Sequence, residues 1–132
     1  MTWVCLAMAI YFEARSEDIE GQLAVAHTIL NRVEASQFPD TVCDVVYQGK
    51  YKGDHPIKYQ CQFTFWCDGK PEVISNGDSW SQAVGLSVVT LMGFTDDPTG
   101  GATHYHADYV NPSWASHGYP MVSIGKHLFY RL

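Results

Sequence analysis

The chain has 132 residues, a mass of 14.8 kDa and a net charge of −6, from 8 Lys and Arg against 14 Asp and Glu. Hydrophobic residues make up 46%, which allows one sizeable core, so we expect a single domain over residues 1–132. The acidic balance disfavours a nucleic-acid partner, and an aromatic content of 14% excludes a disordered chain. No apolar run reaches the roughly 20 residues of a membrane span.

A buried helix is expected over residues 3–14. Residues 3–12 (WVCLAMAIYF) are apolar and lead directly into Glu13 and Arg15. No Lys or Arg precedes this run and no small-residue cleavage site follows it, so it does not have the pattern of a secretory signal. We therefore expect a core helix of the mature domain, with any export using a removed leader or another route.

A second helix is expected over residues 18–35. Ser16 or Asp18 can cap its N-terminus, and Pro39 is expected to stop it. Its apolar positions recur every three or four residues: Ile19, Leu23, Ala26, Leu30 and Val33.

The middle of the chain is expected to hold little regular structure. Residues 48–60 combine three basic residues with Gly and Pro, which predicts a loop. Residues 61–68 (CQFTFWCD) are typical of a strand, and Asp68 with Gly69 marks a turn.

A third helix is expected to open at a capping box over residues 79–82 and to end at Gly93 in a left-handed cap. One of its faces would carry Trp80, Val84, Val88 and Leu91. Residues 102–110 and 121–131 are then expected to form two strands. The order predicts an α+β fold with three main helices and a small antiparallel sheet.

Glu13 is the sharpest candidate for chemistry. It ends an apolar helix directly after Tyr11 and Phe12. The negative end of the helix dipole and desolvation by the aromatic neighbours both raise the pKa of such a carboxyl, as a general acid requires. The alternative is a solvated glutamate paired with Arg15, because most surface glutamates have no function.

A histidine-rich segment follows at residues 102–109. Period-two alternation places His104, His106 and Asp108 on one face of a strand. These three are candidate zinc ligands, with His117 or His127 as a fourth. The alternative is a polar strand that faces a cleft and hydrogen-bonds a substrate.

Aromatic residues are spread through the second half of the chain and suggest stacking against sugar rings. They are Tyr47, Tyr51, Tyr59, Phe63, Phe65, Trp66, Tyr105, Tyr109, Trp114 and Tyr119. Gln62, Thr64, His104 and Asn111 could bind sugar hydroxyls.

Four cysteines allow three disulfide pairings, and buried free thiols are the alternative. Cys61 and Cys67 are six positions apart, a separation that a hairpin could close. Two disulfides would indicate an oxidising compartment.

Three segments together resemble the SleB/CwlJ-type cell wall hydrolases, which include spore-cortex-lytic enzymes and some phage endolysins. They are residues 9–17 (AIYFEARSE), 20–26 (EGQLAVA) and 29–33 (ILNRV), against a family signature of E-A-R-G-E, E-G-Q and N-R-V. Further matches in the same order are Phe38-Pro39, residues 45–48 (VVYQ), residues 62–64 (QFT), Asp68-Gly69 and residues 124–129 (IGKHLF). Ser16 replaces the Gly of the motif, and Thr64 replaces the usual Ser of Q-F-S.

The resemblance implies a lysozyme-like or transglycosylase-like catalytic domain that degrades peptidoglycan with Glu13 as its acid. One carboxylate suffices if the muramoyl C6 hydroxyl is the nucleophile, so it implies a lytic transglycosylase that forms 1,6-anhydro-muramoyl ends. Hydrolysis by water is the nearby variant. We expect Gln62, Phe63, Thr64, His104 and Tyr105 to contact the glycan.

We expect Cys61 to be bonded to Cys67, leaving Cys5 with Cys43. The family fold also implies that the first helix and the region after the second helix pack closely, so that Cys5 and Cys43 can meet. We expect a monomer without a cofactor that acts on glycan strands in the cell wall, the periplasm or outside the cell; a phage-encoded lysin is one possible source. Two other classes stay open. A metal-dependent amidase or peptidase would use His104, His106 and Asp108, and a glycan-binding module would have no activity.

Overall fold

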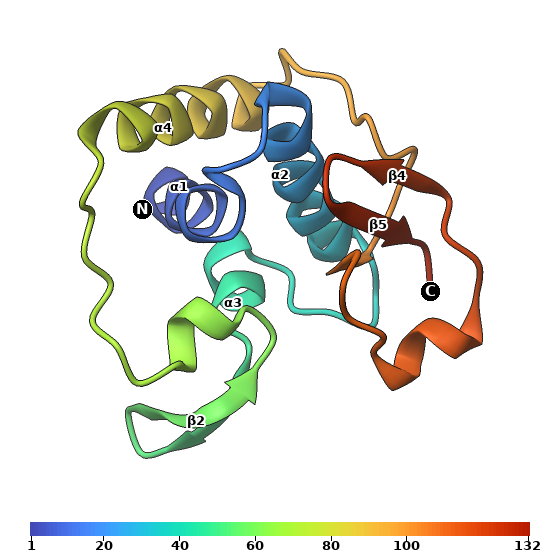
Figure 1. Cartoon of the computed structure of the whole chain (residues 1–132). Helices are drawn as coiled ribbons and strands as arrows, with labels where there is room; N and C mark the ends of the chain where they lie inside the picture. Colours follow the sequence, from blue (N-terminus) through green and yellow to red (C-terminus); the bar gives the residue numbers. More distant parts are fainter.

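The computed structural model describes all residues 1–132 and places one helix, α1 (Thr2–Ala14), at the centre of the others. Helices α2 (Ile19–Glu34), α3 (Val42–Val46) and α4 (Gly77–Leu91) all pack against it. Figure 1 shows α1 enclosed by these three helices. None of the helices combines the length and apolarity that crossing a membrane requires.

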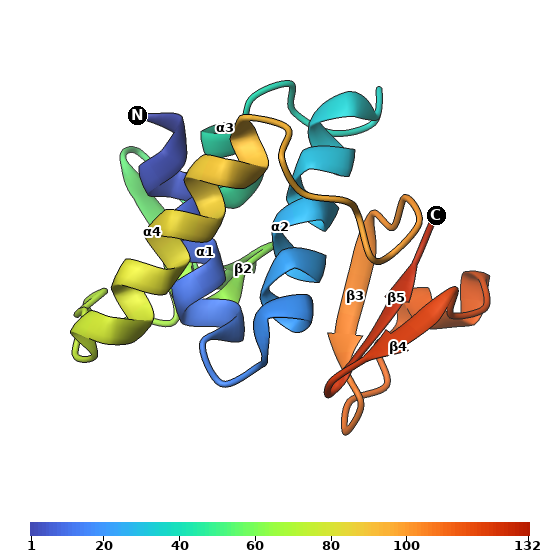
Figure 2. The same cartoon turned by 90° about the horizontal axis from the view of Figure 1, so that it is seen from above.

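The strands form two separate antiparallel sheets. The first is a hairpin of β1 (Gly49–Lys52) and β2 (His55–Cys61), and the second has the order β3–β5–β4. The second sheet consists of β3 (His104–Ala107), β4 (Val122–Ile124) and β5 (His127–Tyr130). In Figure 2 this sheet lies beside α2, on the side away from α1. The fold is therefore α+β, as the sequence predicts, with one more sheet than expected.

Helix α1 forms the core because it is apolar on almost every side. Leu6, Ile10 and Tyr11 are completely buried. The Tyr11 hydroxyl accepts hydrogen bonds from the backbone N–H groups of Ser75 (3.1 Å) and Asn76 (3.0 Å). Tyr11 thereby joins the last turns of α1 to the start of α4.

Helix α2 begins where the sequence predicts. The Asp18 carboxylate accepts a hydrogen bond from the backbone N–H of Gly21 at 2.9 Å, so Asp18 is the cap. The helix ends at Glu34, one residue before the predicted end at residue 35 and five positions before Pro39. Its inner residue Ala24 packs against Ala102, Ile124 and Phe129, which attaches the second sheet to the helical core.

The expected loop at residues 48–60 is wrong, because these residues form the β1–β2 hairpin. Lys52 pairs with His55 across a two-residue turn, in which Gly53 has a φ of +62°. The residues of β1 are all exposed. Alternation of apolar and polar residues marks only strands with one buried face, so the sequence carries no such signal here.

The expected strand at residues 61–68 is also wrong. Strand β2 ends at Cys61, and Thr64–Cys67 is a one-turn 3-10 helix, η1. Phe63, Phe65 and Cys67 are buried while Gln62 and Thr64 are exposed, so the burial alternates as it would in a strand. The turn after it is present: Gly69 has a φ of +80°.

Helix α4 starts earlier than the predicted capping box. The Asn76 side chain accepts a hydrogen bond from the Ser79 N–H at 3.1 Å, so Asn76 is the cap. The buried positions of α4 are Ala83, Ser87 and Thr90. Of the predicted face, Trp80, Val84 and Leu91 pack half-buried against the core, whereas Val88 is 38% exposed. Gly93, with a φ of +83°, ends the helix as predicted.

The structure has three strands in the region where the sequence predicts two. The expected strand at residues 102–110 is the shorter β3, and residues 121–131 contain both β4 and β5. These two pair through a tight turn at Gly125, whose φ is +57°. The carboxylate of Glu17 lies so close that any Cβ at this position would be 2.6 Å from it.

Two disulfides close the N-terminal half. Cys5 is bonded to Cys43, and Cys61 to Cys67, which is the pairing that we expected. The first joins α1 to α3 across 38 positions of sequence, and the second joins the end of β2 to η1 across 6.

Removing the first disulfide should cost more stability than removing the second. The chain-entropy model gives about 4 kcal/mol for the longer loop and about 2 kcal/mol for the shorter one. Urea unfolding of the Cys5→Ala/Cys43→Ala and Cys61→Ala/Cys67→Ala variants compares the two losses. A larger loss from the second pair would contradict this ranking.

Candidate active site

A cleft of about 400 Å³ lies where the end of α1 faces β3 and residues 62–64. It is lined by Phe12, Glu13, Arg32, Gln62, Phe63, Thr64, Tyr105, His106, Ala107, Tyr109, Val110 and His127. Glu13 is the only carboxylate among these residues. Helix α1 and the second sheet, which are far apart in sequence, thus supply facing walls.

Glu13 lies in an environment that favours its neutral form. Burial raises the pKa of its carboxyl above the ordinary value of 4.5. A hydrogen bond from the Tyr105 hydroxyl to Glu13 Oε1 and the positive charge of Arg32 lower the pKa and offset part of this effect. Because Tyr105 occupies Oε1, Oε2 is the oxygen left to carry the acidic proton.

The alternative pairing of Glu13 with Arg15 is wrong. The Arg15 guanidinium instead donates a hydrogen bond to the Tyr11 hydroxyl and lies 4.8 Å from the centre of the Tyr11 ring. Arg15 therefore stabilises the junction between α1 and α4, and it forms no ion pair with Glu13.

Arg32 places a cation beside Glu13 inside the protein. Its Nε donates to the backbone carbonyl of Thr103 at 2.6 Å, and its guanidinium lies over the rings of Phe38 (4.7 Å) and Phe63 (5.4 Å). Burial lowers its pKa to about 10. A guanidinium with that pKa remains charged at neutral pH and favours a negative charge on Glu13 when one forms.

Tyr105 is held by the register of the second sheet. It pairs with Phe129 of β5, and its ring lies 5.0 Å from the ring of His127 and 5.5 Å from that of Phe129. Burial raises the pKa of its hydroxyl well above 10, with Glu13 adding to the effect. Tyr105 therefore stays protonated and serves as a hydrogen-bond donor.

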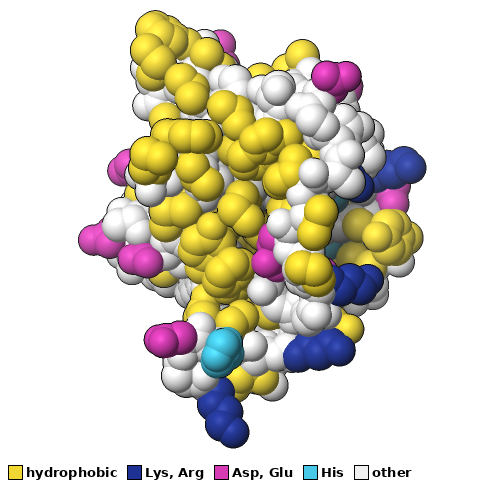
Figure 3. All heavy atoms as spheres, turned by 90° about the vertical axis from the view of Figure 1, so that its left-hand side faces the viewer, with side chains coloured by type: hydrophobic (Ala, Val, Ile, Leu, Met, Phe, Trp, Pro, Cys, Tyr) yellow, Lys and Arg dark blue, Asp and Glu magenta, His cyan; other side chains and the backbone are white.

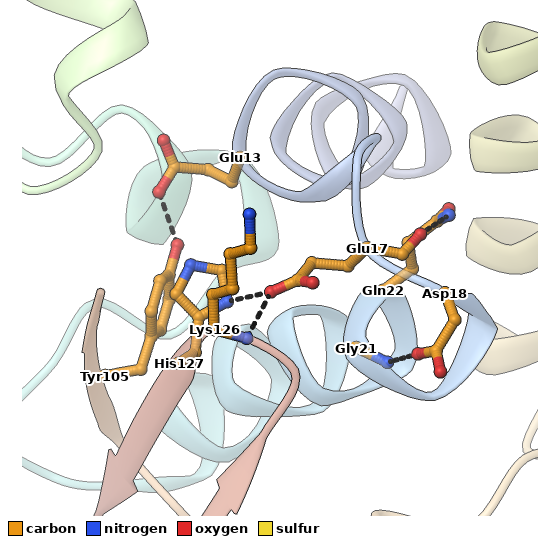
Figure 4. A network of polar contacts seen from close by, with 8 residues as sticks. All are labelled: Glu13, Glu17, Asp18, Gly21, Gln22, Tyr105, Lys126 and His127. Carbon is orange, nitrogen blue, oxygen red and sulfur yellow. Dashed lines mark hydrogen bonds and ion pairs between the residues drawn. The ribbon is translucent and has the colours of Figure 1, made fainter. Parts of the chain in front are cut away.

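Glu17 contacts Lys126 and His127 at the turn beside Tyr105 (Figure 4). Its Oε1 accepts a hydrogen bond from the backbone N–H of Lys126 at 3.0 Å and lies 3.1 Å from His127 Nδ1. Burial lowers the pKa of His127, and the nearby Glu17 carboxylate counteracts this. Glu17 thus ties the α1–α2 connection to the β4–β5 turn.

Four of the five expected glycan-contacting residues line the cleft: Gln62, Phe63, Thr64 and Tyr105. The fifth, His104, does not. Its ring packs instead between Phe38 and Trp114, at 5.6 Å and 5.1 Å. Arg32 and His127 line the cleft without having been singled out for it, although both lie in segments that carry the family resemblance.

The candidate metal ligands do not converge. The ring nitrogens of His106 contact the Tyr130 hydroxyl (2.8 Å) and the Ala107 carbonyl (2.7 Å), and Asp108 is exposed. No group of three or more His, Cys, Asp or Glu side chains is arranged to hold a metal ion.

Residues 16–130 match the protein family described as Cell Wall Hydrolase. The chain belongs to this family. It is 35% identical to the spore cortex-lytic enzyme of Halalkalibacterium halodurans and 34% identical to that of Bacillus subtilis. Each comparison covers 94% of this chain but only 33% and 35% of the respective relatives, so the chain spans about a third of their length.

Two solved structures have a similar fold. One is the catalytic domain of the germination-specific lytic transglycosylase SleB from Bacillus anthracis, with a TM-score of 0.70 and 31% identity. That comparison covers 97% of this chain and 92% of the SleB chain. The catalytic domain of the Bacillus cereus SleB protein gives a TM-score of 0.66 and 30% identity, with coverage of 97% and 88%.

Replacing Tyr105 with Phe should slow cleavage of purified peptidoglycan about 10- to 100-fold at the pH optimum, because the carboxylate formed on Glu13 loses a donor. In the wild type the hydrogen bond from Tyr105 lowers the pKa of Glu13, so its removal raises this pKa. The alkaline limb of the pH profile should therefore move to higher pH. Initial rates across pH measure both effects.

The matched control is Tyr119→Phe, because Tyr119 is 92% exposed and does not line the cleft. An alkaline limb that stays in place or moves to lower pH in Tyr105→Phe would contradict the assigned role.

Proposed function

We propose that this domain is a lytic transglycosylase that cleaves the bond between N-acetylmuramic acid and N-acetylglucosamine in peptidoglycan. The observation that carries the proposal is the single carboxylate of the cleft, Glu13. Glycosidases that hydrolyse their substrate mostly use two carboxyl groups flanking the bond. One carboxyl group can act alone when the sugar supplies its own nucleophile, and the SleB relative is itself a lytic transglycosylase.

In the first step Glu13 acts as the general acid. Burial favours the protonated carboxyl, and Oε2 delivers this proton to the glycosidic oxygen as the bond to the muramoyl C1 breaks. Tyr105 holds the carboxyl from its other oxygen, which fixes the direction of delivery. Positive charge then develops at C1, beside a newly formed carboxylate.

In the second step the same carboxylate acts as the general base. The muramoyl C6 hydroxyl attacks C1 and passes its proton to Glu13, which closes the 1,6-anhydro ring and restores the neutral acid. Between the two steps the carboxylate is stabilised by the hydrogen bond from Tyr105 and by the charge of Arg32. No other proton carrier is needed.

The walls of the cleft suit a glycan. Phe12 supplies apolar surface for the C–H faces of sugar rings, and Gln62 and Thr64 expose amide and hydroxyl groups. Phe63 lies between them, 2% exposed, as the base of this wall. We propose that residues 62–64 bind the sugars that flank the cleaved bond. The Cys61–Cys67 disulfide keeps this short segment in one conformation.

The proposed place of action is the cell wall, on the outer side of the cytoplasmic membrane, with glycan strands as the partner and residues 1–132 acting as one monomeric catalytic domain. Two disulfides in 132 residues support this, because disulfides persist in oxidising compartments.

Replacing Glu13 with Gln should abolish cleavage of purified peptidoglycan, with a loss of at least about 10²- to 10⁴-fold. Mass spectrometry of the soluble products from the wild type should show anhydro-muramoyl ends. Reducing ends would indicate hydrolysis, and free peptides would indicate an amidase. Cleavage by Glu13→Gln at the wild-type rate would contradict the role of Glu13.

The control for this variant is its own stability. An acid whose pKa is raised by folding binds its proton more tightly in the folded state than in the unfolded state. The free energy of unfolding therefore falls as the pH rises through the folded-state pKa. Gln stays neutral, so Glu13→Gln should resist urea at pH 7 at least as well as the wild type. A loss of activity with retained stability then reports on the chemistry alone.

A further inference from the structure

A second cavity, of about 220 Å³, lies outside the Glu13 cleft, between the β1–β2 hairpin and the turn after η1. Its lining consists of Pro56, Lys58, Trp66, Cys67, Gly69, Lys70 and Glu72. None of these residues lines the first cleft. The proposed reaction uses none of them.

A bulge in β2 brings Lys58 to this cavity. Gly49 pairs with Cys61 and Tyr51 with Pro56, so two steps along β1 correspond to five along β2. Within this bulge Tyr59 adopts a φ of +62°, which costs about 1 kcal/mol or more for a residue with a Cβ. Lys58 consequently lies against the turn: a Cβ at Gly69 would be 3.1 Å from Lys58 Cε and 3.5 Å from its Nζ.

The floor of the cavity is rigid. The Trp66 indole N–H donates to the Tyr51 hydroxyl at 2.7 Å, and its ring lies 4.1 Å from that of Tyr47. The Cys61–Cys67 disulfide joins the same wall to β2. Lys58, Lys70 and Trp66 therefore line one cavity on a braced scaffold.

The cavity is basic on a chain that is acidic overall. Four of the eight Lys and Arg lie between residues 49 and 70: Lys50, Lys52, Lys58 and Lys70. The one ion pair within 4.0 Å in the molecule joins His127 to Glu17, so none of these lysines is neutralised by a carboxylate at that distance. In Figure 3 basic side chains stand at the lower end of the face, where the hairpin lies, below a broad apolar area.

The cavity is close to the cleft. Thr64 lines the cleft, and Trp66 and Cys67 line the cavity, yet all three belong to the four-residue helix η1. A 3-10 helix rises about 2 Å per residue, so the two sites are separated by about 6 Å along η1. Three extended peptide residues span about 10 Å. The span of a short peptide attached to a sugar in the cleft therefore matches the separation of the cleft and the cavity along η1.

We propose that this cavity binds the peptide stem of peptidoglycan through its carboxylates, with Lys58 and Lys70 as their partners. This rests on the proposed function. The single acidic lining residue, Glu72, suits the amino group of the diamino acid in such a stem. The enzyme would then prefer strands that carry peptides over bare glycan.

Binding without turnover tests the proposal. In a Glu13→Gln background, fluorescence anisotropy compares soluble labelled strands that carry their stems with strands from which an amidase has removed them. Lys58→Gln/Lys70→Gln should raise the Kd for peptide-bearing strands about tenfold, as expected for two solvent-exposed charge pairs, and leave the Kd for bare strands unchanged.

The matched control is Lys50→Gln/Lys52→Gln, which removes the same charge from the same hairpin but not from the cavity. It should change neither Kd by more than about twofold. Equal weakening on both strand types, no weakening on peptide-bearing strands, or an equal effect of the control pair would overturn the proposal. Because no cleavage is measured, failure of the transglycosylase assignment would show in the product masses and not here.

A second arm separates carboxylates from the phosphates of attached wall polymers. Strands treated with hydrofluoric acid lose those phosphates and keep their stems. The lysine dependence should persist after this treatment. Its disappearance would show that the cavity binds phosphate, which would overturn the proposal.

Discussion

The structure depends on withdrawing one carboxyl group partly from water. Glu13 ends an apolar helix, and β3 closes over it so that the Tyr105 hydroxyl is a direct hydrogen-bond partner. Burial alone raises the pKa of the carboxyl, whereas Tyr105 and Arg32 limit that rise. The balance leaves an acid that can give up its proton and take it back, which is what a mechanism with a single carboxylate requires.

Much of the molecule serves to hold β3 against α1. Arg32 donates to the Thr103 carbonyl and Asn31 to that of Ala102 at 2.8 Å, so the end of α2 fixes the residues that precede β3. Glu17 does the same for the β4–β5 turn. The segments that resemble the family signature are therefore mostly anchors, and Glu13 is the one residue among them that we propose reacts with substrate.

The sequence predicts those parts whose signals are local. Helices α1 and α2 follow from apolar spacing and from the Asp18 cap, and Glu13 stands out because a charged residue follows an apolar run. The β1–β2 hairpin leaves no such pattern because none of its strand residues is buried, and the burial of residues in η1 alternates as it would in a strand. The role of Arg32 depends on Thr103, 71 positions away, and no local pattern reports a contact of that kind.

Measurement of the pKa of Glu13 is the most direct test of its role as the general acid. Carbon-13 NMR of protein labelled at the glutamate side-chain carboxyl, assigned by comparison with Glu13→Gln, follows its titration in the intact domain. We expect a midpoint above the ordinary value of 4.5, because burial raises the pKa of Glu13. A midpoint at or below 4.5 would mean that the site does not favour the protonated carboxyl, and it would contradict the role of Glu13 as the general acid.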